Sequence, residues 1–300
     1  MLKVKKKFFR LSQFGLLLFL FISVFAFGQD NSLNHNTARY DMSDGSCFAV
    51  YFLDVGQADS ALIICKGEAM IIDGGNRADA DLVEKYMEKL NIRHLKYIVA
   101  THAHEDHIGG LPGALKQADA EQAFSPVSSH NTKTFKNFVH SLQLRNINIT
   151  KPQKGETDLP LGMSKVEIFT TDKNYKNTNN TSIVVKIIHE NTSFIFTGDI
   201  EAEAEKDFVE SGYDLTATVL KAPHHGSSTS DSDLFLKAVR PDFAVISVGK
   251  NNTYGHPSKL ILERFNSAHI IVYRTDILGT IKVLSDGQKV FFSTMSNSDF

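Results

Sequence analysis

The chain has 300 residues, with 32 basic and 34 acidic side chains and a formal net charge of −2. This length suits one large α/β domain with a sizeable core. Residues 1–28 carry five basic and no acidic side chains, so without them 32 − 5 = 27 basic residues face 34 acidic ones, a net charge of −7. This balance argues against a protein that binds nucleic acid non-specifically, although a local basic groove is compatible with it.

The N-terminus has the pattern of a secretory signal peptide. A basic start (Lys3, Lys5, Lys6, Lys7 and Arg10) precedes an apolar run over residues 14–27, which ends in Ala26-Phe27-Gly28. The run is short for a membrane span of about 20 residues. We expect a signal peptide over residues 1–28, a loose leader over 29–45 and a single domain over 46–300. The mature protein would be secreted or periplasmic, with no stable membrane span after cleavage.

Two apolar runs near the start of this domain are expected to pair as a β-hairpin. They cover residues 47–53 and 60–65, with a turn over residues 56–59. In that register Cys65 lies opposite Val50, about three residues or roughly 10 Å from Cys47 at the usual rise of a strand. We therefore expect no disulfide, although an oxidising compartment would permit one.

The rest of the chain alternates between strand-like and helix-like segments. Val83, Tyr86, Met87 and Leu90 share one face of a helix expected over residues 79–92. Further helices are expected at residues 113–118, 134–144, 200–211, 232–239 and 258–265. Strands are expected at residues 69–72, 97–100, 183–188, 193–197, 216–221, 242–248, 269–273, 278–284 and 289–294.

A cluster of ligand-type residues follows the strand at residues 97–100: His102, His104, Glu105, Asp106 and His107. Imidazole and carboxylate groups are ligands of zinc and similar divalent ions. On an extended backbone His102 and His104 point the same way, while Asp106 and His107 can turn toward a second position. One short loop can therefore serve two adjacent ions, the alternative being a polar surface loop.

Polar residues elsewhere in the chain also follow predicted strands. Asp73, Asp199, His224 and His256 each come just after the C-terminal end of one. Ligand sites gather at this edge in sheets that helices cover. We therefore expect these four residues and the histidine loop to meet in one cleft.

In order along the chain, these motifs resemble those of the metallo-β-lactamase superfamily of hydrolases. The similarity is to the ComEC-type competence-protein hydrolase domain and to the teichoic-acid phosphorylcholine esterases, and it covers about residues 48–285. The motifs lie at residues 52–59, 73–75, 101–110, 179–182, 197–199, 221–227, 254–257 and 274–276. The resemblance implies an α/β fold, a four-layer αββα sandwich, with two divalent metal ions in the edge cleft, zinc first and manganese as the alternative.

The resemblance also implies a role for each site residue. The implied metal ligands are His102 and His104 at the first ion, Asp106, His107 and His224 at the second, and Asp199 bridging both. Asp73 either orients a ligand or only forms a turn, and His225 is either an outer ligand or a substrate contact. The candidate catalytic residues are Asp106, His225 and His256, and the candidate supporting or substrate contacts are Asp73, Asn180, Ser227 and Asn252.

One ligand of the superfamily is missing from this pattern. Many members carry a third histidine of the first site about twenty residues before the bridging aspartate, where this chain has Asn179 and Asn180. His189 is the nearest histidine, but a hairpin centred near residues 190–191 pairs Asp199 with about Ser182. That register places His189 at the opposite tip, roughly 25–30 Å away.

Three functions are compatible with the sequence. The first is a secreted metal-dependent phosphodiesterase, phosphoesterase or nuclease, with nucleic acid or an envelope phosphodiester as substrate. The second is another hydrolase of the same fold, such as a lactonase, thioesterase or β-lactamase, and the third is a non-catalytic binding module. Residues 226–229 either present backbone amides to an anion or serve as an ordinary helix cap. The physiological substrate and the oligomeric state stay open.

Overall fold

The computed structural model describes residues 48–153, 156–171 and 173–297. All of these belong to one compact unit. The expected signal peptide, the expected leader and Cys47 lie outside the described residues. Within the described ranges, no helix has both the length and the apolar character to cross a membrane.

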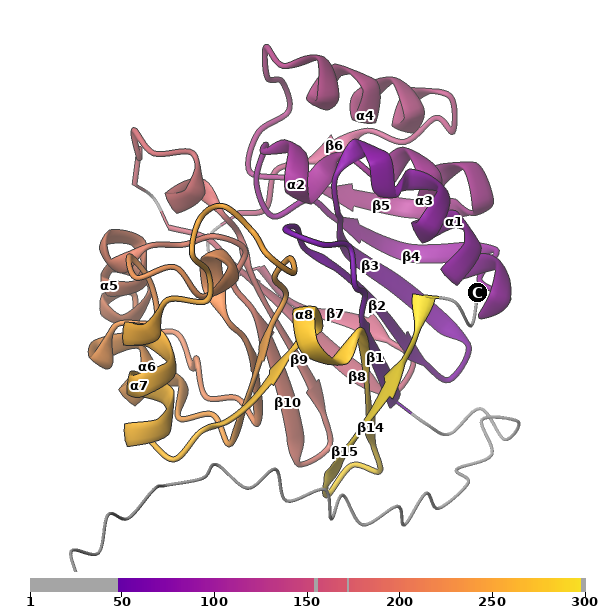
Figure 1. The fold of residues 1–300 in the computed structure, drawn as a ribbon. Helices are drawn as coiled ribbons and strands as arrows, with labels where there is room; N and C mark the ends of the chain where they lie inside the picture. The colour runs from indigo at the N-terminus through magenta and orange to yellow at the C-terminus, as the bar shows by residue number, and fades with distance from the viewer. Residues whose placement is uncertain (1–47, 154–155, 172, 298–300) are drawn as a thin grey trace, which may run out of the picture. The chain divides into compact units, whose positions relative to one another are not determined.

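Two β-sheets pack face to face at the centre of this unit (Figure 1). Sheet 1 runs in the spatial order β15 (Val290–Met295), β14 (Thr280–Ser285), β1 (Phe48–Phe52), β2 (Ser60–Cys65), β3 (Glu68–Gly74), β4 (His94–Val99), β5 (Asp119–Phe124) and β6 (Ile149–Thr150). Sheet 2 runs in the order β13 (Ile271–Arg274), β12 (Phe243–Ile246), β11 (Val219–Lys221), β10 (Thr192–Phe196), β9 (Val184–His189), β8 (Ser164–Phe169) and β7 (Glu156–Leu161).

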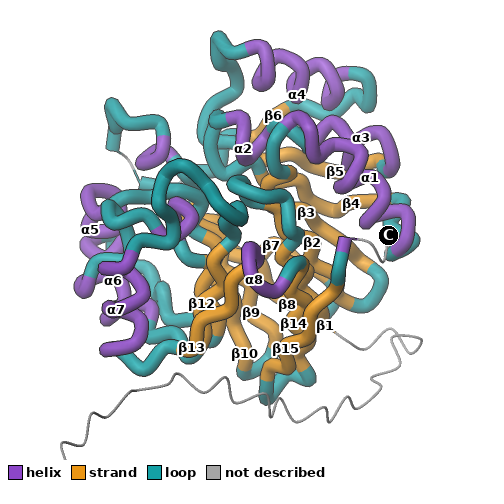
Figure 2. The backbone as a smooth tube through the Cα atoms, viewed as in Figure 1, coloured by secondary structure: helices purple, strands orange, loops and turns teal. Residues whose placement is uncertain are grey.

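Helices cover the outer face of each sheet, as Figure 2 shows. The main helices over sheet 1 are α1 (Ala80–Lys89), α3 (Leu111–Gln117) and α4 (Lys133–Gln143). Those over sheet 2 are α5 (Ala202–Glu210), α6 (Asp233–Val239) and α7 (Lys259–Ser267). The short helices α2 (Glu105–Ile108) and α8 (Thr275–Leu278) lie in loops after strands. The expected αββα sandwich is confirmed.

The period-two pattern of the strands builds this layering. In β1, Phe48, Val50 and Phe52 face sheet 2, while Ala49 and Tyr51 face the helices of sheet 1. Successive side chains of a strand point to opposite faces, so a buried strand of this kind is apolar on both sides. The helices start at hydroxyl caps: Thr132, Ser232 and Ser258 each accept a backbone N–H in the first turn of α4, α6 and α7.

Two register expectations have different outcomes. The β9–β10 hairpin pairs Phe196 with Val185, and the backbone N–H of Asp199 donates to Ser182 Oγ at 3.1 Å, so the expected pairing of Asp199 with Ser182 is confirmed. The β1–β2 register was wrong, because Cys65 lies opposite Phe48 and not Val50. The connection between the two strands covers residues 53–59, and the N–H of Leu53 closes it by donating to the carbonyl of Ser60. Cys65 is a buried free thiol whose Sγ accepts a hydrogen bond from Ser164.

The region over residues 119–169 holds strands that the pattern did not predict, namely β5, β6, β7 and β8. In β5 the exposed and half-buried residues before Ala123 and Phe124 dilute the apolar signal. Sheet 1 is parallel from β3 to β6, and sheet 2 is parallel from β10 to β13. Each sheet therefore presents a row of strand C-termini at one edge.

Candidate metal centre

The site residues reach one place because they follow parallel strands. Asp73 lies at the end of β3, and the histidine loop follows β4. Asp199 follows β10, and His224 and His225 follow β11. Both sheets therefore contribute to the centre, each from its row of strand C-termini.

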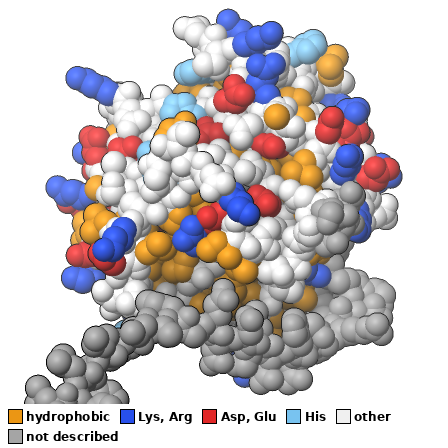
Figure 3. All heavy atoms as spheres, in the orientation of Figure 1, with side chains coloured by type: hydrophobic (Ala, Val, Ile, Leu, Met, Phe, Trp, Pro, Cys, Tyr) orange, Lys and Arg blue, Asp and Glu red, His pale blue; other side chains and the backbone are white. Residues whose placement is uncertain are grey.

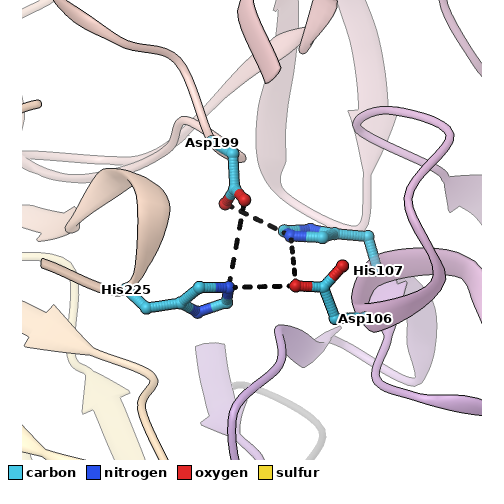
Figure 4. A group of neighbouring side chains, drawn as sticks. All are labelled: Asp106, His107, Asp199 and His225. Atoms are coloured by element: carbon cyan, nitrogen blue, oxygen red, sulfur yellow. Dashed lines mark hydrogen bonds and ion pairs between the residues drawn. The ribbon is translucent and has the colours of Figure 1, made fainter. Parts of the chain in front are cut away.

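Four side chains converge in Figure 4: Asp106, His107, Asp199 and His225. One donor atom from each lies within 4.8 Å of the others. Nε2 of His107 is 3.2 Å from Oδ1 of Asp199, and Nε2 of His225 is 3.4 Å from Oδ2 of Asp106. Two imidazoles and two carboxylates facing one point are a donor set for a divalent ion.

Two donor atoms of this cluster have no hydrogen-bond partner among the described residues. His107 Nε2 and Asp199 Oδ1 are fully buried, and neither makes a hydrogen bond with any described residue. Their 3.2 Å separation is close enough for an ion pair, but its geometry is not that of a hydrogen bond. Buried polar atoms are normally satisfied, so orphaned donors that face one point fit a bound cation.

A second donor pair lies on the other side of Asp199. Nε2 of His102 is 3.9 Å from Asp199 Oδ2 and 3.1 Å from Nδ1 of His104. His102 is fully buried and His104 is half-buried. Oδ1 of Asp199 therefore faces His107, while Oδ2 faces His102 and His225. The carboxylate therefore has a histidine of each donor set within 4 Å of its oxygens.

His224 and His225 exchange the places expected from the sequence. The fourth donor of the cluster is His225, whereas His224 points to the rim, where Asn179 Nδ2 lies 3.3 Å from its Nε2 and Glu201 Oε1 lies 3.5 Å from its Nδ1. Both histidines have left-handed backbones, with φ of 50° and 53°. Non-glycine residues adopt this region at a cost, and such conformations cluster at functional sites. These backbone angles decide which of the two adjacent side chains faces the cluster.

Buried carboxylates support the two imidazoles from behind. Asp73 Oδ2 lies 2.8 Å from Nδ1 of His107, a contact through which a carboxylate can orient an imidazole. The N–H and hydroxyl of Thr101 donate to the same carboxylate. On the other imidazole, Nδ1 of His225 lies 2.9 Å from the Ser247 carbonyl and 3.2 Å from Asp59 Oδ1.

Lys221 completes this supporting layer, and the sequence analysis missed it together with Asp59 and Ser247. Its ammonium group lies 2.8 Å from Asp59 Oδ2 and donates to the Ala222 carbonyl, and the side chain is 4% exposed. A lysine at the end of a buried strand and an aspartate at the end of a loop were the available signals. Neither signal shows which side chain the residue contacts, because the contact forms only when the two sheets pack together.

The charges of these buried groups strongly affect one another's pKa values. Burial opposes the charge on His225, but Asp199 and Asp59 raise its pKa to about 10. Burial likewise opposes the charge on Asp199, but His107 and His225 hold its pKa well below the usual range. Burial and the neighbouring His107 lower the pKa of His102 well below its ordinary value. Without an ion, protons on the histidines supply the positive charge of the cluster. A metal ion must therefore displace these protons in order to bind.

A cavity of about 530 Å³ opens over this centre. Its lining residues are Gln57, Asn76, His104, Glu105, Asp106, Asn179, Asp199, His224, His225, Tyr254 and His256. Among these described lining residues there is no lysine or arginine. On the face that Figure 3 shows, basic and acidic side chains are interspersed.

Residues 53–250 match the family described as the metallo-beta-lactamase superfamily. The chain belongs to the metallo-β-lactamase superfamily. It therefore has the fold of a metal-dependent hydrolase, with the strand edges and donor residues placed as that fold requires.

Curated relatives are 27–28% identical to this chain over the aligned residues. ComE operon protein 3 of Bacillus subtilis is 28% identical over 252 residues, which cover 78% of this chain and 32% of that protein. Competence protein ComA of Neisseria gonorrhoeae is 27% identical over 236 residues, 78% of this chain and 32% of that one. Recombination protein 2 of Haemophilus influenzae is 27% identical over 242 residues, 77% of this chain and 28% of that one. The chain thus spans about a third of the length of these relatives.

Solved structures show the same fold. CmlA, a diiron beta-hydroxylase from Streptomyces venezuelae, matches with a TM-score of 0.51 and 10% identity, over 83% of this chain and 54% of that chain. A mutant of CmlA beta-hydroxylase gives a TM-score of 0.53 and 11% identity, over 79% of this chain and 53% of that one. At these identities the likeness concerns the fold alone.

Asn179 and Asn180, which stand where many superfamily members have a histidine, differ in direction. Asn179 lines the cavity. Asn180 points away from it, accepting the N–H of Glu201 and donating to Glu203 Oε2. Asn180, the expected supporting or substrate contact, therefore does not line the cavity, because the turn of 3₁₀-helix over Asn179–Thr181 directs the two side chains differently.

The remaining candidate residues have local structural roles or line the rim. Ser227 Oγ accepts the N–H of Thr229, and α6 begins only at Asp233, so residues 226–229 neither form a helix cap nor offer amides at a helix start. Asn252 bonds within its own loop and does not line the cavity. His256 lines the cavity, where burial and nearby His224 lower its pKa to about 4.

Proposed function

We propose that the protein is a secreted hydrolase that cleaves phosphodiesters with two divalent ions, zinc first, bound around Asp199. The observation that carries the proposal is the placement of this carboxylate between two donor sets, His102 with His104 and His107 with His225. Two ions about 3.5–4 Å apart suit displacement at phosphorus, because they can stabilise both the attacking and the leaving oxygen. The N-terminal basic and apolar pattern supports export.

When bound, the ions would lower the pKa of a water molecule and offset the charge that builds on the phosphate. The chain's own residues hold the ligands and move protons. Asp73 and Asp59 fix the orientation of His107 and His225. Gln57 Nε2 lies 3.5 Å from Nδ1 of His256, so the proton of this neutral imidazole belongs on Nε2, where it can donate a hydrogen bond to a leaving oxygen. His225 is buried within the ligand cluster, so it does not act as a proton donor to the leaving group.

The charge of the residues that line the cavity narrows the class of substrate that we propose. Since the described lining residues include no lysine or arginine, the charge of a bound phosphate is offset by the ions and not by a basic wall. This favours short or single-stranded nucleic acid, or a small envelope phosphodiester, over a long duplex. The names of the relatives, which refer to competence and recombination, support nucleic acid within this class.

The test is a panel of substrates offered to the metal-loaded protein: single-stranded DNA, bis-p-nitrophenyl phosphate, a phosphorylcholine ester, a lactone and nitrocefin. We expect cleavage of phosphodiesters and little or no opening of nitrocefin. The Asp199→Ala variant should lose both its bound metal and its turnover, which excludes a contaminating nuclease. A well-metallated protein that cleaves no phosphoester but opens nitrocefin or the lactone would refute the proposal.

A further inference from the structure

Tyr254 stands at the mouth of the cavity with its ring largely in solvent. It is 72% exposed, yet it is one of the residues that line the 530 Å³ cavity. It lies in the loop between β12 and α7. A single exposed aromatic residue needs no explanation by itself, so the way this ring is held is what matters.

The loop that carries Tyr254 is fixed by one asparagine. Oδ1 of Asn252 accepts the N–H of Tyr254 at 3.1 Å and that of His256 at 3.0 Å. Its Nδ2 donates to the carbonyls of Gly249 and His256. The N–H of Gly249 in turn donates to Oε1 of Gln57 in the opposite wall. The ring of Tyr254 is therefore carried by a loop that hydrogen bonds hold in place at Gly249 and at His256.

The ring also has a defined orientation. It stacks on the imidazole of His256, with ring centroids 5.7 Å apart and planes inclined by 26°. His256 continues into the cavity, where its ring meets that of His224 edge-on at 5.7 Å. The mouth of the cavity thus carries an exposed aromatic face whose orientation is set by the stacked imidazole of His256. Planar groups stack on such faces, and this type of contact suits every nucleobase.

We infer that Tyr254 is the stacking platform for a nucleobase next to the scissile phosphate. This inference rests on the proposed function, since it names the group that adjoins the phosphate in the same site. The described lining residues include no lysine or arginine that could hold a second phosphate, so affinity beyond the reacting group must come from another kind of contact. Apart from histidines, Tyr254 is the one aromatic residue among the described lining residues.

A quaternary ammonium group is the other chemistry that aromatic rings recognise. Its binding sites usually surround the cation with several aromatic faces. Here a single tyrosine face is open to the ligand, which suits one planar ring better than a spherical cation. A choline group is therefore an outcome of the test and not the proposal.

The test measures binding separately from turnover. Dissociation constants of the metal-loaded protein are determined for thymidine 5′-monophosphate, for deoxyribose 5-phosphate, which lacks the base, and for phosphorylcholine. We expect the wild type to prefer the nucleotide, and Tyr254→Ala to weaken nucleotide binding by about 5- to 150-fold without affecting the base-free ligand. Tyr254→Phe keeps the ring and should keep the preference. Leu144→Ala, at a similarly exposed position outside the cavity lining, is the control.

The outcomes separate the two proposals. A nucleotide preference that survives Tyr254→Ala, or an equal loss for both ligands, overturns the stacking inference. A loss seen only for phosphorylcholine overturns it in favour of an ammonium site. A base preference that depends on Tyr254, in a protein that cleaves no phosphodiester, supports the stacking inference and refutes the proposed hydrolysis.

Discussion

His224 and His225 are neighbours in the chain but contact different groups. His225 belongs to the four-residue donor cluster, while His224 meets Asn179 and Glu201 at the rim. Sequence spacing cannot separate two adjacent histidines, because their directions depend on backbone angles of 50° and 53° that the residue types do not favour. The other donors were predictable, since their motif follows a strand whose position the apolar pattern reveals.

We predict that the two histidines differ in their effect on metal binding. His225→Ala should lower the zinc affinity by more than about 100-fold, because even the loss of a supporting partner costs about 10–100-fold. His224→Ala should leave metal content nearly unchanged. Competitive titration against a chelator, with metal content measured by mass spectrometry, gives both values. The reverse ranking would restore the assignment made from the sequence.

Lys221 is a second residue whose importance follows from burial. Its ammonium faces Asp59 inside the protein, and both side chains are at most 6% exposed. Removing one partner of a buried pair leaves an uncompensated charge, which costs about 3–5 kcal/mol. Lys221→Met should lower the free energy of unfolding by roughly this amount, as measured in urea.

The double variant Lys221→Met with Asp59→Asn provides the control for this prediction. It removes both charges, so it should recover most of the stability lost in Lys221→Met. Lys237→Met, at an exposed site, should change little. A loss below about 1 kcal/mol in Lys221→Met, or a double variant no more stable than the single one, would contradict the assigned ion pair.

Among the elements, the junction of α2 and α3 shows how packing holds the site. A Cβ atom on Gly110 would meet the Gly74 carbonyl oxygen at 2.0 Å, and one on Gly109 would meet the backbone N of Arg77 at 2.3 Å. The two glycines therefore let the histidine loop dock directly against the turn that follows Asp73. This contact keeps Asp73 within 2.8 Å of His107.

Gly110→Ala should therefore affect both stability and metal affinity. We expect a loss of about 1–3 kcal/mol from overpacking, together with weaker zinc binding as Asp73 and His107 separate. Gly212→Ala is the matched comparison, because its φ is 75° but nothing lies within 4 Å of the added Cβ. That variant should lose some stability and keep its zinc affinity. Equal zinc affinities in the two variants would argue against the docking role.

The start of α6 contains a buried carboxylate that the site does not use. Asp231 is fully buried, and neither carboxylate oxygen makes a hydrogen bond with the described residues. Burial and the neighbouring Glu205 raise its pKa well above 3.8. The protonated form is favoured in the folded chain, so the stability contributed by this group is fully present below about pH 3.8 and is lost as the pH rises through the raised pKa.

Asp231→Asn should consequently stabilise the protein at neutral pH. We expect a gain of about 1–2 kcal/mol at pH 7 that shrinks toward pH 4, since a neutral amide costs less to bury than a carboxylate. Asparagine also tolerates the left-handed backbone of this position, where φ is 52°. Urea unfolding at several pH values measures the effect, and Asp242→Asn at an exposed position is the control. A gain that does not depend on pH would point to another cause.

Elements were predictable from the sequence where periodicity was strong. The helix expected over residues 79–92 appears as α1, and most strands near the site were found within a few residues of their bounds. The strands over residues 119–169 were missed because their exposed polar residues hide the alternation. Local pattern also could not give the β1–β2 register, since a connection of seven residues has no fixed turn geometry.

At the scale of the whole molecule, the layers were predictable but the order of strands was not. Alternating strands and helices favour a sheet covered by helices, and the family resemblance supplied the second sheet. The expected hairpin identified β2 as one neighbour of β1, but nothing in the composition of β1 shows that its other neighbour is β14. Long-range pairing of this kind depends on the whole chain, and so does the meeting of two sheet edges that creates the metal centre.

The pairing of β1 with β14 sets a minimum time for completing sheet 1 while the chain is being synthesised. Phe52 lies beside Ile281, so β1 must wait for a partner that is made roughly 230 residues later. At about 5–20 residues per second, a ribosome takes roughly 10–45 s to cover that distance. Throughout this interval one edge of the strand is open to other chains, because an unpaired strand is a template for association. A growing chain is thus most exposed to aggregation before its last hairpin emerges.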